Sequence, residues 1–250
     1  MSDAPAMTMP FAPALAIATR ELRSFFRLPV GWVVLALYAA LTGAVFALDT
    51  LRPGEPATMR AFFATAGILL MAVGPAVSMR LFSEEIRTGG IEPLATAPVG
   101  DLALVLGKYL GSVLFLGAIL LPTLAFPIAL AILSDPKPDP GPIVAGYLAL
   151  ALLGCLVLAV GTAASALTSS QTLAFLATLL VLLGFTLATS RLPAQLDPRL
   201  GELFAGWSPT ARLRDFARGV IDPAHAVYFL ALSGVALSVA WGAVRGRRTG

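Results

Sequence analysis

The sequence predicts an all-α polytopic membrane protein with six transmembrane helices, and three observations lead to this fold class. First, 58% of the residues are hydrophobic and only 12% are charged, whereas about a quarter are charged in ordinary soluble domains. Second, the apolar residues form runs of about 20 residues, the length of helix that crosses the roughly 30 Å hydrocarbon core of a bilayer. Third, Lys and Arg lie at the ends of these runs, as in membrane proteins. Although the net charge is +3, this distribution indicates no nucleic-acid partner.

An amphipathic helix is expected before the first span, over residues 14–28. Its apolar residues, which include Phe25 and Phe26, recur at three- and four-residue steps, and Arg20 and Glu21 belong to its polar face. Such a helix suits the membrane surface, with basic residues near the lipid phosphates and Phe in the acyl boundary. The alternative is a flank that only supplies positive charge to the first span.

Apolar runs predict the six spans, and Pro29 opens the first of them. The third run is too long for a straight crossing, so it must tilt or bend, and Pro122 and Pro127 are the expected break points. Gly107 and Gly111 in this run form a small-xxx-small pair that allows close helix contact, either within the chain or at a dimer seam. The expected spans cover residues 30–48, 61–79, 102–133, 143–166, 172–189 and 226–244.

The links between the spans bear on orientation. The longest of them, residues 190–225, carries balanced acidic and basic residues with short amphipathic pieces. An even number of spans places both termini on one side of the membrane. Compact basic clusters lie near both termini, and such clusters favour the cytoplasm. We therefore expect both termini in the cytoplasm.

Side chains suited to catalysis or ion binding are scarce. With Lys108 counted as part of the polar segment before it, the spans contain no Asp, Glu, Lys or Arg, whereas ion-driven carriers need such groups near the midplane. His225 alone makes neither a metal site nor a metalloprotease motif. Gly107-Lys108 lacks the glycine spacing of a phosphate loop, and Tyr109 replaces its Ser or Thr. The sequence therefore predicts no enzyme and no metal or cofactor bound by this chain.

A polar interruption from Met79 to Lys108 overlaps the start of the third apolar run, and its residues 80–101 link the second span to the third. It reads as a short helix over residues 83–88, ended by Gly89 and Gly90, and a second amphipathic piece over residues 91–97. Two short elements divided by glycines form a compact charged surface rather than a loose loop. Such a surface can fill a groove on a soluble partner and receive force from it. The alternative is a solvated connector without a partner.

Two blocks of the sequence resemble the permease subunits of ABC-2 transporters. The first block reads RELRSFFRLPVGWVVLALYAALTGAVF (Arg20 to Phe46), and the second reads RLFSEEIRTGGIEPLATAPVGDLALVLGKYLG (Arg80 to Gly111). The resemblance is closest to the gliding-motility-associated branch, whose members read approximately KEL-x-SFF and RLFSEE-x-R-x-G-T-I-E-L-L-x-T-x-PV. The number of spans and the placement of the loops extend the resemblance over nearly the whole chain.

The resemblance implies a role for each block. The first would form an interfacial elbow helix against membrane lipid, and the second would include a coupling helix that docks on a separate ABC ATPase. It also implies a complex of two permease chains, as a homo- or heterodimer in a prokaryotic inner membrane, with two ATPase chains that bind ATP and Mg. In such a complex, residues 190–225 would form an external gate. At two positions this sequence differs from the pattern of that branch: Gly90 stands where the branch has Thr, and Pro93 where it has Leu. The elbow residues would be Arg20, Glu21, Phe25, Phe26 and Pro29, and the coupling residues Glu84, Glu85, Arg87, Gly89, Gly90, Ile91, Glu92, Thr96 and Pro98.

Two other functions stay open from the sequence. A non-transporting membrane anchor or regulatory subunit would recruit a soluble protein through the same polar segment, and ATP-dependent flux in vesicles distinguishes a permease from it. A membrane-embedded lipid-modifying enzyme would use polar residues of 190–225, and activity of the purified chain without an ATPase would favour it. The apolar spans do not encode the substrate or the direction of transport.

Overall fold

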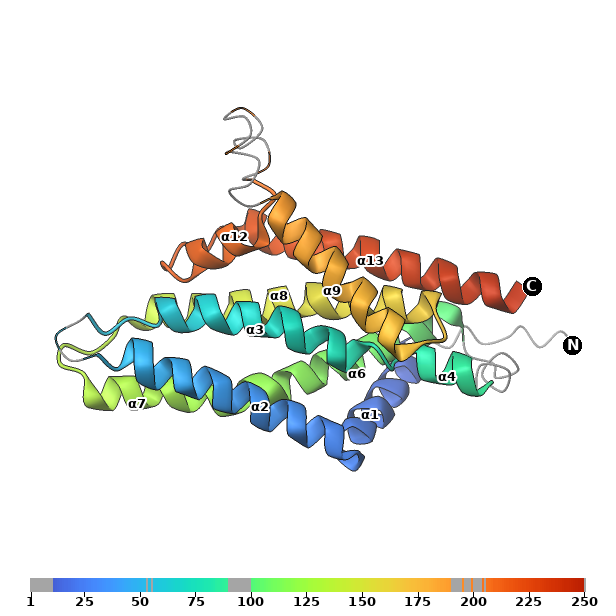
Figure 1. The fold of residues 1–250 in the computed structure, drawn as a ribbon, viewed down its shortest axis with the longest axis horizontal. Helices are drawn as coiled ribbons and strands as arrows, with labels where there is room; N and C mark the ends of the chain where they lie inside the picture. Colours follow the sequence, from blue (N-terminus) through green and yellow to red (C-terminus); the bar gives the residue numbers. More distant parts are fainter. Residues whose placement is uncertain are drawn as a thin grey trace, which may run out of the picture.

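Long apolar helices make up the fold (Figure 1). The computed structural model describes residues 11–52, 56–89, 100–189 and 206–249, together with the single positions 54, 195, 199 and 204. All regular secondary structure in these ranges is helical. Six helical stretches among them are long and apolar enough to cross a membrane. The predicted all-α polytopic membrane fold is therefore confirmed.

Two of the spans are built from more than one helical segment. The spanning segments are α2 (Pro29–Val45) with the π-helix η1 (Phe46–Thr50), α3 (Arg60–Ser78), α6 (Asp101–Leu120) with the 3-10 helix η2 (Leu121–Leu124) and α7 (Ala125–Leu133), α8 (Pro140–Leu167), α9 (Gln171–Ala188) and α13 (Pro223–Thr249). Shorter helices are α1 (Phe11–Arg27), α4 (Ser83–Thr88) and α12 (Pro209–Phe216).

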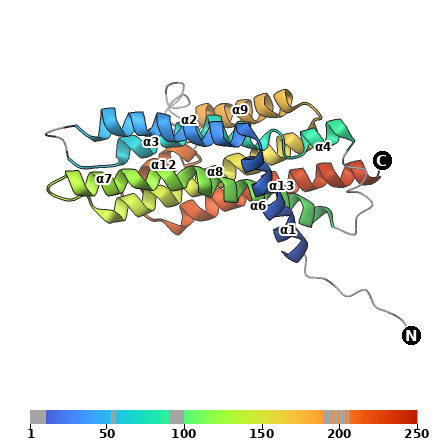
Figure 2. The same ribbon diagram turned by 90° about the horizontal axis from the view of Figure 1, so that it is seen from below.

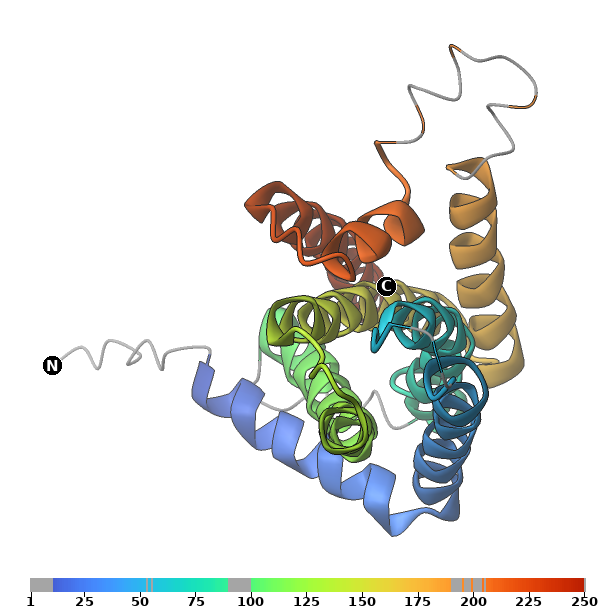
Figure 3. The same cartoon turned by 90° about the vertical axis from the view of Figure 1, so that its left-hand side faces the viewer.

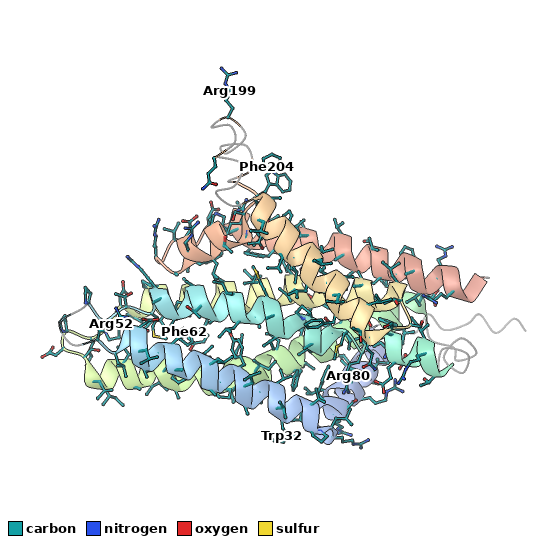
Figure 4. All side chains as sticks on the ribbon, viewed as in Figure 1. Trp32, Arg52, Phe62, Arg80, Arg199 and Phe204 are labelled. Atoms are coloured by element: carbon teal, nitrogen blue, oxygen red, sulfur yellow. The ribbon has the colours of Figure 1, made fainter. Side chains whose placement is uncertain are left out.

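The two ends of the bundle differ. α1, α4 and the C-terminal end of α13 lie toward one end, which we call the terminal end, and the far ends of η1 and α7 lie at the other (Figure 1). Arg52 marks this other end (Figure 4). A view along the long axis shows α1 lying across the bundle, and the view from below shows the same crossing (Figures 3 and 2). An amphipathic helix across the bundle axis has the orientation of an interfacial helix.

α8 is the central helix, and it packs against α3, α6, α9, α12 and α13. Its glycines let neighbouring helices approach closely. A Cβ atom at Gly161 would lie 1.8 Å from the Ser78 hydroxyl of α3. A Cβ atom at Gly154 would lie 2.4 Å from the Leu116 side chain of α6. Because hydrophobic burial adds little between helices in lipid, such close packing is a main source of their association.

The third span bends where proline chemistry predicts it. η2 separates α6 from α7 and carries Pro122. Pro127 lies in the first turn of α7 and has no N–H, so the Thr123 carbonyl four residues earlier lacks its helical donor. The Tyr147 hydroxyl of α8 donates to that carbonyl at 2.7 Å. A neighbouring helix thus supplies the hydrogen bond that the bend removes.

Candidate functional site at the α4 junction

The short helix α4 follows α3 after a turn over residues 79–82. Its first turn holds Glu84 and Glu85, and carboxylates there interact favourably with the positive end of the helix dipole. Gly89 ends the helix with a φ of 72°, a left-handed conformation that glycine adopts without strain. The structure thus has the helix expected over residues 83–88. The expected coupling residues outside the described ranges are Gly90, Ile91, Glu92, Thr96 and Pro98.

Ser165 of α8 takes the place of a local cap for α4. The residue that precedes the helix, Phe82, provides no side-chain cap. Instead, the backbone N–H groups of Phe82 and Ser83 donate to the Ser165 hydroxyl oxygen at 2.9 and 3.0 Å. That hydroxyl in turn donates to the Met79 carbonyl at 3.0 Å. Because the first N–H groups of a helix have no partner within it, one hydroxyl of α8 fixes where α4 begins.

Replacing Ser165 with alanine is expected to loosen α4 specifically. The change removes the acceptor of two buried N–H groups, and loss of a capping hydroxyl costs about 0.5–2 kcal/mol. Hydrogen exchange of the α4 amides should accelerate while exchange in the centre of α8 stays unchanged. The matched control is Ser238→Ala, because the exposed Ser238 hydroxyl donates only within its own helix, to Gly234. If the α4 amides exchanged at the same rate in Ser165→Ala and Ser238→Ala, Ser165 would not be the residue that caps α4.

Lys108 of α6 connects α4 to the bundle. Its side chain is buried, with 1% of the residue exposed. The ammonium group donates to the Glu85 carboxylate at 2.8 Å and to the Leu81 carbonyl at 2.6 Å. It lies 3.8 Å from the Glu21 carboxylate of α1 and 5.2 Å from the centre of the Phe82 ring. A buried charge is stable only when it is paired and hydrogen-bonded, and here partners from α1, α4 and the preceding turn surround it.

The position of Lys108 corrects the sequence-based assignment. The sequence assigns this lysine to the polar segment and leaves the spans without charge. In the structure it lies within α6, seven residues after Asp101 begins the helix, and so about two turns inside it. The third span therefore contains a charged residue, which is neutralised by carboxylates of the same chain. We call the set Glu21, Leu81, Glu85, Lys108 and Ser165 the α4 junction.

Two arginines extend the contacts between α1 and α4. Arg20 lies 3.9 Å from the same Glu85 oxygen that Lys108 binds, and its side chain is largely exposed. Arg80, labelled in Figure 4, donates to the Ser24 hydroxyl at 2.9 Å and lies 5.0 Å from the centre of the Phe25 ring. Exposed ion pairs contribute little to stability, so the buried Lys108 contacts carry most of this connection.

The burial of the expected elbow residues differs from the sequence-based expectation. Phe25 does not reach the acyl boundary: it is buried and stacks on Phe115 of α6, with 4.5 Å between ring centres. Phe26 contacts Trp32 and Phe115 edge to face. Glu21, expected on the polar face, is also buried because it faces Lys108. Pro29 begins α2, and of this set only Arg20 and Pro29 are exposed.

Gly107 and Gly111 hold α1 close to α6. A Cβ atom at Gly107 would lie 2.7 Å from the Ile17 side chain and 2.9 Å from the Ala14 carbonyl oxygen. A Cβ atom at Gly111 would lie 2.6 Å from the Glu21 side chain and 2.9 Å from a backbone oxygen of α1. The small-xxx-small pair is therefore occupied within the chain by α1, and it does not form a seam with a second chain.

A recess of about 550 Å³ lies between α1 and α4. Its lining includes the basic residues Arg20, Arg27 and Arg80 and the acidic residues Glu21, Glu84 and Glu85. Glu84, Arg87 and Thr88 are exposed on α4. Among the described residues, no group of three His, Cys, Asp or Glu side chains is placed to hold a metal ion. The paired charges of the junction hold helices together.

The α12 part of the 190–225 stretch is packed against the bundle. The Ser208 hydroxyl caps α12 by accepting from the Ala211 N–H. Leu213 and Phe216 are buried, and α12 contacts α3 and α8. His225 lies against the Phe216 ring, with 5.6 Å between ring centres. The expected amphipathic piece is present, and its apolar face is covered by protein.

Comparison with known protein families identifies the family of this chain. A family described as ABC-2 family transporter protein matches residues 28–240. A comparison with curated proteins gave no match. The family match extends from the start of α2 into α13 and includes α4, Ser165 and Lys108. The chain therefore belongs to the ABC-2 family of transporter proteins.

Proposed function

We propose that this chain is the membrane-spanning permease subunit that forms the translocation path of an ATP-driven transporter, with α4 as the element through which a separate ATPase subunit acts. Membership of the ABC-2 family supports the transport role. The observation that carries the coupling role is the bond between Glu85 of α4 and the buried Lys108 of α6. ATP and Mg would be bound by the ATPase, as the resemblance implies.

Connections to three other helices suit α4 to the transmission of force. Ser165 joins its beginning to α8, Lys108 joins its first turn to α6, and Arg20 joins it to α1. A displacement of α4 therefore moves α6, α8 and α1 with it. Packed helices respond to such a displacement by shifting between discrete arrangements rather than by gradual deformation.

The outward face of α4 is the proposed contact with the ATPase. Glu84 and Arg87 are exposed, whereas Glu85 is directed toward Lys108. Glu84 and Arg87 would contact the partner, and Glu85 would hold α4 in place. The remaining residues of the proposed docking segment, Gly89 to Pro98, follow from the resemblance alone.

The terminal end would face the cytoplasm, where ATP is available. α1, α4 and the C-terminal end of α13 lie toward this end, and the basic clusters near both chain termini favour the same orientation. In this arrangement the 190–225 stretch lies toward the outside of a prokaryotic inner membrane, where it would act as a gate. Two permease chains and two ATPase chains would complete the transporter, and the gliding-motility branch is the proposed subgroup.

Charge reversal on the outward face of α4 tests this function. Glu84→Lys with Arg87→Glu is expected to abolish binding and stimulation of the ATPase while leaving membrane insertion and thermal stability unchanged. Like charges across an interface reduce association, and neither residue belongs to the junction. The matched control is Lys137→Glu, an exposed residue in the link between α7 and α8. Normal ATPase stimulation by the double variant would refute the docking assignment. Stimulation without ATP-dependent flux in vesicles would instead support the anchor function.

A further inference from the structure

An apolar groove of about 740 Å³ lies between α8, α9 and α13. α9 packs against α8 and α3, whereas α13 packs against α8 and α6, so α9 and α13 diverge from their common neighbour (Figure 3). α8 forms the floor of the groove, and the other two helices form its walls. Wall residues include Leu176 and Leu180 on α9 and Val235 and Val239 on α13.

Hydrocarbon must fill this groove when the chain lies in a bilayer. The four named wall residues are each more than 40% exposed, so the protein itself does not cover them. Water does not occupy an apolar site that offers it no hydrogen-bond partners. The floor extends along α8 from Leu156 to Leu167, a rise of about 17 Å at 1.5 Å per residue. That length is about half of the roughly 30 Å hydrocarbon core, so the groove matches one leaflet.

The basic side chain of Arg247 lies at the terminal end of the groove. Arg247 donates to the Ala166 carbonyl at 3.3 Å and to the Leu167 carbonyl at 3.1 Å, directly beside Thr168, which lines the groove. A guanidinium has five N–H donors, and these bonds engage two of them. Residues 140–189 and 223–250 contain no Asp or Glu, so the three helices supply no acidic residue to balance this charge.

We propose that the groove binds an anionic phospholipid of the surrounding bilayer, with one acyl chain between α9 and α13 and its phosphate beside Arg247. The apolar walls accept the chain, and their length matches its leaflet. The free N–H groups of the Arg247 guanidinium attract a negatively charged headgroup and form charge-assisted hydrogen bonds to phosphate oxygens. This binding is independent of α4 and of the ATPase.

Spin-labelled lipids test the proposal with the intact chain. The protein is reconstituted in phosphatidylcholine vesicles that contain a trace of phosphatidylglycerol or phosphatidylcholine carrying a nitroxide on its acyl chain. The immobilised fraction of each probe is measured by electron paramagnetic resonance. Phosphatidylglycerol should be preferred about fivefold for each basic side chain near the headgroup. Equal immobilisation of the two probes would overturn the proposal.

Variants distinguish the groove from the rest of the surface. Ala177→Phe and Ala236→Phe fill the groove from opposite walls and should remove the preferred lipid. Ala40→Phe, at an exposed position of α2, should leave it bound. Arg247→Gln should lower the preference and Arg247→Lys should retain it, because only the lysine variant keeps the charge. An unchanged preference in both groove-filling variants, or in Arg247→Gln, would overturn the assignment.

A second copy of the chain is the competing occupant. With Cys155 changed to Ser, a Leu180→Cys variant carries its only cysteine in the groove. No disulfide between copies is expected when lipid occupies the groove. Formation of such a disulfide, together with loss of the immobilised probe on dimerisation, would assign the groove to a second copy and overturn the proposal.

Discussion

Replacing Lys108 with methionine is expected to destabilise the chain by about 3–5 kcal/mol, because the change leaves the buried Glu21 carboxylate and the partly buried Glu85 carboxylate without their cation. Glu85 and Glu21 both face the ammonium group, at 2.8 and 3.8 Å. Methionine fills much of the space but donates no hydrogen bond to them or to the Leu81 carbonyl. Unfolding of the detergent-solubilised chain measures the loss, and faster hydrogen exchange in α1 and α4 locates it.

Two further variants serve as controls: one removes a lysine at an exposed position, and the other removes Lys108 together with its closest carboxylate. Lys137→Met removes an exposed lysine and should leave stability unchanged. Lys108→Met with Glu85→Leu removes both partners of the closest pair and should regain part of the lost stability, because an apolar pair can replace a buried ion pair. Stimulation of the ATPase should remain low in this double variant, since the connection from α4 to α6 is still absent. A stability of Lys108→Met equal to that of the unchanged chain would refute the structural role of the lysine.

Replacing Gly107 and Gly111 together with leucine is expected to separate α1 from α6. Backbone oxygens of α1 lie 2.9 Å from where each Cβ atom would be placed, and backbone atoms move aside only if the whole helix moves. Overpacking of this kind costs about 1–3 kcal/mol at a single site, and occasionally more. Buried residues of α1, among them Phe25 and Glu21, would become exposed. Hydrogen exchange and proteolysis of α1 should both increase strongly.

Gly117 provides the matched control for this pair. It lies on the same helix, and a Cβ atom there would meet nothing within 4 Å. Gly117→Leu should therefore leave α1 as protected as in the unchanged chain. If the double variant behaved like Gly117→Leu, the close packing of α1 on α6 would be refuted.

The span architecture is predictable because its signals are local. A helix that crosses the bilayer needs about 20 apolar residues in sequence, and each span meets this condition within one continuous stretch. The bend of the third span is also local, since Pro122 and Pro127 disturb hydrogen bonds only within the neighbouring turns. Neither feature depends on which helices become neighbours.

The α4 junction could not be predicted in this way, because its contacts join distant residues. Phe82 bonds to Ser165 across 83 positions and Lys108 to Glu85 across 23. A single serine in an apolar helix carries no signal of a remote partner. A lysine near the start of an apolar run is typical of a membrane flank, and so the sequence assigned Lys108 to the polar segment.

The sequence also does not show that the neighbouring residues Glu84 and Glu85 have different surroundings. Glu84 and Glu85 fit the RLFSEE pattern on which the resemblance rests equally well. Successive residues of a helix point about 100° apart, so Glu85 faces Lys108 while Glu84 is exposed. The Gly107 and Gly111 pair did signal a close helix contact, but only the fold identifies α1 as the helix that fills it.

Labelling of a cysteine at position 87 tests the central claim most directly. Arg87 is exposed on the outward face of α4, and Cys155 is changed to Ser so that Arg87→Cys carries the sole thiol. In intact cells a membrane-impermeant maleimide should leave this cysteine unlabelled. In inverted membrane vesicles the same reagent should label it, and bound ATPase should block the reaction. Labelling in intact cells would place α4 outside the cytoplasm and contradict the account.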